Sequence, residues 1–168
     1  MKKQSLTLAA FAATAVAAPA SAADLTVSVE IPRLTTASYH RPYVAVWIER
    51  PDETSVRTLA VWYEVSNVAE GKDWLKDIRT WWRRGGRAMT MPADGISSAT
   101  RAPGSHRITV PGARLSALPA GQYVMVVEAD RELGGREVVR VPFRWGGANT
   151  ASGRGSTELG AVSVAVTR

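Results

Sequence analysis

Hydrophobic and polar residues alternate over short stretches along most of the chain, which is the pattern of half-buried β-strands. The alternation is clearest from Leu25 to Ile31 and again from Ala161 to Val166. Five further stretches are bounded by Pro, Gly, Asp or Asn: Tyr43 to Glu49, Arg57 to Val65, Arg107 to Val110, Tyr123 to Ala129 and Glu137 to Phe143. Seven short strands predict a mainly β protein, an antiparallel two-sheet sandwich.

The hairpin predicted from Tyr43 to Glu49 and Arg57 to Val65 is apolar on both of its faces. Symmetric pairing about its polar turn places Trp47 opposite Trp62, so that both indoles share one face. Because the other face is also apolar, this hairpin needs two covers. The opposite sheet supplies one of them.

One amphipathic helix, predicted from Lys72 to Arg84, interrupts the β pattern and is expected to be the second cover. Gly85 and Gly86 are expected to end it. Its apolar residues recur at helical spacing: Trp74, Leu75, Ile78, Trp81 and Trp82.

Five of the six tryptophans lie in this hairpin and helix, which permits two interpretations. In one, Trp81, Trp82 and Arg83 bind a planar cofactor such as flavin, with the guanidinium on a phosphate. In the other, the helix seals the sheet and the tryptophans form a core. We favour the core, because aromatic residues at helical spacing mostly bury one another. The structural residues on this view include Trp47, Trp62 and Trp74.

A second hairpin is predicted from Gln122 to Trp145, with a two-residue turn at Gly134 and Gly135. Symmetric pairing about this turn places Glu128 on a face of valines, where a carboxylate must be paired or protonated. The partners considered are Arg136, Arg140 and Arg41.

Two alternatives for Glu128 stay open at this point. A β-bulge would turn its side chain outward, since a register slip reverses every face. Glu128 and Glu132 can also be interpreted as the acid/base pair of a hydrolase, although no other feature supports that chemistry.

The start of the chain resembles an export signal. Met1 to Lys3 is positively charged, Leu6 to Ala18 is apolar, and Ala20 to Ala22 is a small-residue cleavage site. We therefore expect residues 1–22 to be removed and 23–168 to form a single domain in the periplasm. The apolar run is too short for a permanent anchor, so no stable membrane insertion is expected.

The composition narrows the chemistry further. Absence of cysteine from the 168 residues excludes disulfides, thiolate metal sites and thiol nucleophiles. The net charge of +6 falls to +4 without Lys2 and Lys3, because Lys+Arg drops from 21 to 19 against 15 acidic residues. This mild excess in an exported protein points toward anionic envelope surfaces or ligands rather than nucleic acid. We favour the alternative that the arginines are scattered over a solvated surface.

No catalytic motif is present in the sequence, so we expect a protein that is not an enzyme. The two histidines, His40 and His106, are weak candidates for a shared metal site. Isolated histidines are commonly surface residues, and no metal is expected.

The segment from Ala88 to Ser105 is too long for a simple connector. Its centre resembles the motif on which an exported flavin transferase esterifies FMN, and Asp94, Ser97 and Thr100 match positions of that motif. Ala102 stands where the motif has its acceptor threonine, which leaves Thr100 as the nearby substitute. An ordered turn is the favoured alternative to flavin attachment.

Five segments together resemble the predicted periplasmic family called domain of unknown function 2271. The resemblance implies an immunoglobulin-like sandwich, found near flavin transferases and PepSY membrane proteins in extracytoplasmic electron transfer or iron uptake. The segments are RPYVAVWIE from Arg41, TLAVWYE from Thr58, DWLKDIRTWW from Asp73, ATRAPGSH from Ala99 and GQYVMVVEADRELGGREVVRVPF from Gly121.

The sequence thus predicts a non-catalytic periplasmic accessory protein with an envelope protein as its partner. The alternative is a protein of the same compartment that binds flavin, haem or a metal.

Overall fold

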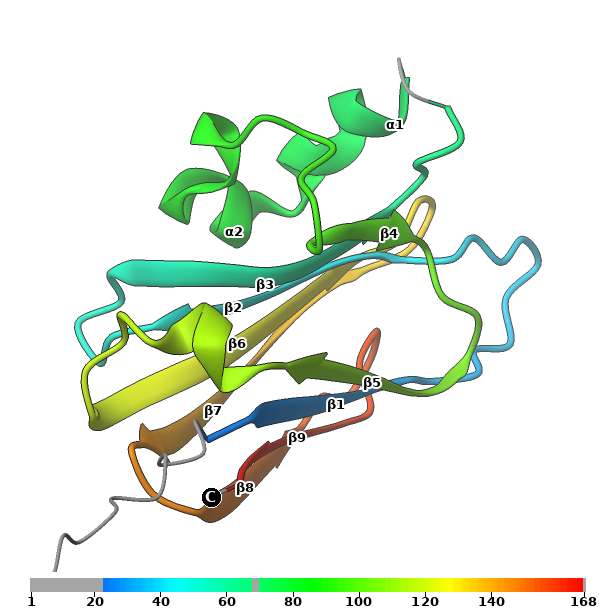
Figure 1. Cartoon of the computed structure of the whole chain (residues 1–168). Helices are drawn as coiled ribbons and strands as arrows, with labels where there is room; N and C mark the ends of the chain where they lie inside the picture. Colours follow the sequence, from blue (N-terminus) through cyan, green and yellow to red (C-terminus); the bar gives the residue numbers. More distant parts are fainter. Residues whose placement is uncertain (1–22, 68–69, 168) are drawn as a thin grey trace, which may run out of the picture.

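The computed structural model describes residues 23–67 and 70–167, which form two β-sheets with a helical segment on one of them (Figure 1). The strands are β1 (Leu25–Ile31), β2 (Tyr43–Glu49), β3 (Ser55–Tyr63), β4 (Ser97–Ala99), β5 (Gly104–Val110), β6 (Gly121–Asp130), β7 (Arg136–Trp145), β8 (Asn149–Arg154) and β9 (Ala161–Val166). The helical turns are α1 (Glu70–Asp73), η1 (Trp74–Asp77), α2 (Arg79–Arg84), η2 (Gly86–Ala88) and η3 (Gly112–Leu115). The predicted export signal lies outside the described residues.

The predicted mainly β sandwich is confirmed. One sheet has the order β5-β1-β9-β8 and the other β4-β3-β2-β6-β7, and all neighbouring strands are antiparallel except β3 and β4. All seven predicted strands exist, with ends that differ by up to three residues. The first and last of them, β1 and β9, lie inside their sheet rather than at its edges.

Two strands were not predicted. β4 has only three residues and lies in the segment interpreted as a loop, while β8 reads NTASGR and has no strongly apolar residue to give an alternating pattern. Neither strand carries a hydrophobic signal of its own, so tertiary pairing decides both.

The main core lies between the two sheets. Alternate residues of β1 and β9 meet alternate residues of β2, β6 and β7 there, as period-two patterns require. Its largest members are Trp62, Trp145, Phe143, Tyr123 and Met125.

A second core lies on the outer face of the five-stranded sheet, under the helical segment (Figure 1). It buries Trp47, Tyr63 and Trp81 together with Leu75 and Ile78. The prediction that the β2–β3 hairpin needs two covers is therefore confirmed.

The predicted pairing of Trp47 with Trp62 is wrong. Trp62 lies opposite Val44, and Trp47 lies opposite Thr58. The pairing shifts by one residue between Val46 and Trp47, and a shift of one residue exchanges the faces. The two indoles consequently belong to different cores.

The single helix predicted from Lys72 to Arg84 is interrupted. α1, η1 and α2 share this segment, and the break falls at Ile78, whose φ of −73° and ψ of 72° are not helical. Leu75 is buried as predicted, but Trp74 is 57% exposed. α2 ends before Gly85, as expected.

The break at Ile78 has a partner in the sheet. The carboxylate of Glu128 on β6 accepts the backbone N–H groups of Thr80 and Trp81 at 3.0 and 2.8 Å. The first amides of a helix have no backbone carbonyl before them to accept their hydrogen bonds. At the start of α2 the Glu128 carboxylate is that acceptor.

The β6–β7 hairpin also departs from its predicted turn. Asp130 pairs with Arg136, so five residues connect the strands, and Leu133 adopts a positive φ of 54°. Gly134 instead leaves room for the Arg131 side chain, because a Cβ there would lie 2.3 Å from Cζ of Arg131. Gly135 similarly lies against Glu158, where a Cβ would be 3.0 Å from the carboxylate.

Buried charges join this hairpin to the β8–β9 connection. Arg131 donates to both carboxylate oxygens of Glu158 at 2.8 and 3.0 Å, and both side chains are buried. Glu137 accepts the backbone N–H groups of Ser156, Thr157 and Leu159. Burial alone would raise the pKa of Glu137, but these amides bring it down to about 2.

We expect Glu137→Gln to lower the free energy of unfolding by about 2 to 3 kcal/mol at pH 7, because a pKa shift corresponds to about 1.4 kcal/mol per unit. The pKa is depressed in the folded state, so this stabilisation exists above about pH 4.5 and is lost as the pH falls toward 2. Urea unfolding of both proteins between pH 7 and 2.5 measures this. A destabilisation independent of pH would contradict it.

Candidate functional site

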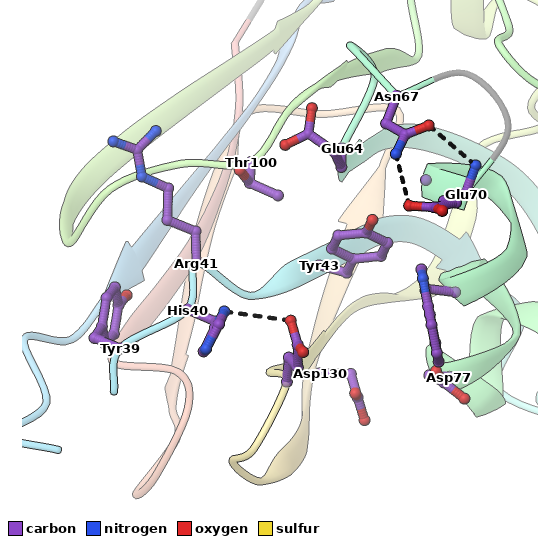
Figure 2. A pocket seen from close by; sticks show the side chains of 13 residues that line it. Tyr39, His40, Arg41, Tyr43, Glu64, Asn67, Glu70, Asp77, Thr100 and Asp130 are labelled. Atoms are coloured by element: carbon purple, nitrogen blue, oxygen red, sulfur yellow. Dashed lines mark hydrogen bonds and ion pairs between the residues drawn. The ribbon is translucent and has the colours of Figure 1, made fainter. Parts of the chain in front are cut away.

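An open groove of about 750 Å³ lies at one end of the sandwich. Figure 1 shows α1, the end of β4 and the segment before β2 on that side of the molecule, and Figure 2 shows Tyr43 amid the lining side chains. The lining residues come from five separate parts of the chain: Tyr39, His40, Arg41, Tyr43, Glu64, Asn67, Glu70, Gly71, Trp74, Asp77, Thr100, Asp130 and Glu132.

The wall formed by α1 is held against the end of β3. Asn67 accepts a hydrogen bond from the backbone N–H of Glu70 at 3.2 Å and donates from its side chain to the Glu70 carboxylate at 2.8 Å. A Cβ on Gly71 would lie 1.9 Å from the carbonyl oxygen of Glu64, so only glycine permits this approach.

The groove is acidic. Five carboxylates line it, against the cations of Arg41 and, when protonated, His40. His40 Nδ1 lies 3.2 Å from the Glu132 carboxylate. Burial raises the pKa of Asp130, and the nearby carboxylate of Asp77 raises it further. Like charges are therefore held close together at a partly desolvated site.

Aromatic rings share this lining with the carboxylates. Tyr43 is half-buried, and burial raises the pKa of its hydroxyl. Trp74 exposes its indole, and Lys76 Nζ lies 5.7 Å from the centre of that ring. Carboxylates next to exposed aromatic faces suit a positively charged group, through ion pairs and cation–π contacts.

Among residues 23–67 and 70–167, no group of three His, Cys, Asp or Glu side chains is arranged to hold a metal ion. The two predicted candidates are not brought to one site. His40 lines the groove, whereas His106 lies 5.6 Å from the ring of Trp62 and is hydrogen-bonded to the carbonyl of Ala102.

The residues proposed from the Trp-rich helix do not line the groove. Trp81 is 1% exposed in the second core, and its indole N–H donates to Thr58 at 3.0 Å. Trp82 is half-buried beside Trp81, and Arg83 is exposed. The core interpretation explains this arrangement.

The residues proposed from the long segment are likewise separated. Asp94 is exposed next to Gly95, whose positive φ of 65° marks a turn, and Ser97 accepts the backbone N–H of Ala93. Thr100 alone lines the groove. The segment is ordered, and Met91 and Ile96 pack on the second core.

Glu128 is fully buried, so the outward bulge is wrong. Arg136, one of the three predicted partners, lies 2.7 Å from its carboxylate. Glu132 lines the groove, and Glu128 does not. The structure therefore does not combine them as an acid/base pair.

Sequence reasoning missed a second buried carboxylate, Glu49 at the end of β2. It accepts the indole N–H of Trp47 at 2.8 Å and forms ion pairs with Arg140 at 2.8 Å and Arg84 at 3.6 Å. β2 pairs regularly with β6, so Glu49 takes the same outer face as Trp47, two residues before it, and this alternation was the available signal.

Most of the groove was also missed. Glu64, Glu70 and Asp77 were not proposed as site residues, and the tertiary structure brings them to one groove with Asp130. These residues share no pattern in the sequence that could have marked them as one site.

A comparison with protein families identifies the chain. The family described as "Predicted periplasmic protein (DUF2271)" matches residues 24–161, and the chain belongs to it. The predicted resemblance is confirmed, and the family description agrees with the predicted periplasmic location. No curated protein and no solved structure matches the chain. No helix in the described ranges is long and apolar enough to cross a membrane.

We expect Asp130→Asn to raise the melting temperature at pH 7. The pKa of Asp130 is raised in the folded state, so its ionisation costs stability as the pH rises above the ordinary value of 3.8. Calorimetry should show a gain that disappears near pH 3. Asp73→Asn is the control, since Asp73 is exposed on α1 outside the groove. A lower melting temperature of Asp130→Asn at pH 7 would contradict the unfavourable ionisation of Asp130 in the groove.

Proposed function

We propose that this protein is a non-catalytic periplasmic accessory protein that works by binding a positively charged group of its partner in the groove. The observation that supports this most is the lining itself: five carboxylates and an exposed indole in a chain whose net charge is +6. The chain as a whole is basic, so its composition does not account for the negative charge of the groove.

Electrostatics favour a cation there. Asp77 and Asp130 repel one another, and burial further disfavours the charged form of Asp130. A guanidinium or ammonium group placed between them replaces this repulsion by attraction, and bidentate carboxylate contacts make arginine the stronger ligand.

Binding without catalysis is supported by how the polar groups of the groove are used. His40 faces the Glu132 carboxylate, and Asn67 is committed to fixing α1. Among the lining residues Thr100 is the one Ser, Thr or Cys side chain, and no described hydrogen bond joins its hydroxyl to a base. A nucleophilic enzyme needs such a pair.

The alternative is a protein that holds flavin, haem or a metal. The place of Thr100 in the groove favours a covalent flavin over the other cofactors. The carboxylates oppose it, since FMN carries a phosphate and like charges repel. The flavin-linked or iron-uptake setting implied by the family resemblance stays a prediction.

Protein purified from its native periplasm should be colourless above the tryptophan band, and its mass should not increase on co-expression with a flavin transferase. Absorption and intact-mass spectra measure this. A mass increase of one FMN that Thr100→Ala abolishes would establish the alternative.

Binding can be tested with N-acetyl-arginine amide as the probe and N-acetyl-citrulline amide as its neutral isostere. In two-dimensional NMR titrations the arginine probe should shift groove resonances and the citrulline probe should not. Asp77→Asn should weaken binding about tenfold, which corresponds to about 1.4 kcal/mol, whereas Asp73→Asn should leave it unchanged. Equal responses to both probes would refute the proposed function.

A further inference from the structure

Two large apolar side chains are exposed in the described part of the chain, one in the groove lining and one next to a lining residue. Trp74 lines the groove and is 57% exposed, and Leu133 follows the lining residue Glu132 and is 81% exposed. An exposed tryptophan beside charged groups is typical of a binding surface, because its large apolar area gains free energy from burial on association.

Leu133 is held in a backbone conformation that leucine rarely adopts. Its φ is 54°, and a bulky side chain at positive φ is strained. Asn and Gly adopt this conformation more readily, and neither would expose a large apolar side chain at the turn. A leucine that is both strained and exposed gains nothing from the described fold, so its advantage lies in a contact outside it.

The groove is also larger than one cation needs. Its volume of about 750 Å³ lies in the range of sites that hold a ligand of several groups. Its carboxylates come from the residue that follows β3, from α1 and η1, and from the β6–β7 hairpin, so the negative charge extends along the groove.

We propose that the occupant is a short basic segment of a partner protein, whose cations meet the carboxylates and whose apolar side chains cover Trp74 and Leu133. This rests on the proposed function and names its partner. Charge complementarity selects a basic segment, and the two apolar residues distinguish a polypeptide from a free polyamine. The ring of Trp74 already attracts the chain's own Lys76 at 5.7 Å, and an arginine of the partner would stack on the same kind of surface.

Selection from a random dodecapeptide library displayed on phage tests the proposal on the protein without residues 1–22. The enriched peptides should contain at least two Lys or Arg residues with an apolar residue near them. For the strongest peptide, Trp74→Ala and Leu133→Asn should each raise the dissociation constant at least tenfold. Asp73→Asn should leave it within twofold, because Asp73 lies outside the groove lining. Asn is chosen because it accepts the left-handed conformation, and circular dichroism confirms folding of each variant.

Several results would overturn the proposal. These are no enrichment, enrichment of neutral or acidic peptides, binding unaffected by Trp74→Ala and Leu133→Asn, or displacement of the best peptide by spermidine at lower concentration. Self-association that Asp77→Asn abolishes would assign the groove to a second copy instead. If any of these occurs while N-acetyl-arginine amide still binds and Asp77→Asn weakens it, the proposed function stands and only the peptide partner fails.

Discussion

Two glutamates buried under the helical segment, Glu49 and Glu128, are the constraint on which this structure depends. A buried carboxylate is costly unless charges and hydrogen bonds surround it, and removing one partner leaves the charge uncompensated. Glu128 takes two amides at the start of α2, and Glu49 reaches Arg84 at its end. Both ends of α2 are thus bonded to buried carboxylates of the sheet beneath it. The helical segment also covers the second core.

This anchoring determines where the groove forms. With α2 held at both ends, the break at Ile78 lets Ile78 and Leu75 turn inward while Trp74 faces solvent. η1 and α1 then continue past the end of β3, where Gly71 allows close contact with Glu64. A continuous helix with Trp74 in its apolar face would remove the exposed ring from the groove. The groove is therefore a consequence of how the outer layer is attached.

The sequence predicts what depends on local periodicity and little of what depends on register. Alternation in β1 and β9 locates these strands to the residue, and the two apolar faces of the β2–β3 hairpin predict both covers. Trp62 was wrongly placed on the face of Trp47, because the β2–β3 pairing shifts by one residue between Val46 and Trp47. The partner of Glu128 was among the predicted arginines, since burial of a carboxylate requires one. The groove could not be predicted, because its acidic residues lie on separate elements and carry no common pattern.

The β6–β7 connection unites stability with the site. Arg131 turns inward to Glu158, and the neighbouring Glu137 receives three amides, so the strand ends are fixed to the β8–β9 connection. Glu132 and Leu133 extend outward from this rigid base. In the binding that we propose, a Leu133 already held on a fixed turn would lose less conformational entropy on association. The same turn leaves Asp130 partly desolvated near Asp77. The inward residues of the turn thus stabilise the fold, whereas Leu133 and Asp130 cost stability, which is the division expected of residues kept for binding.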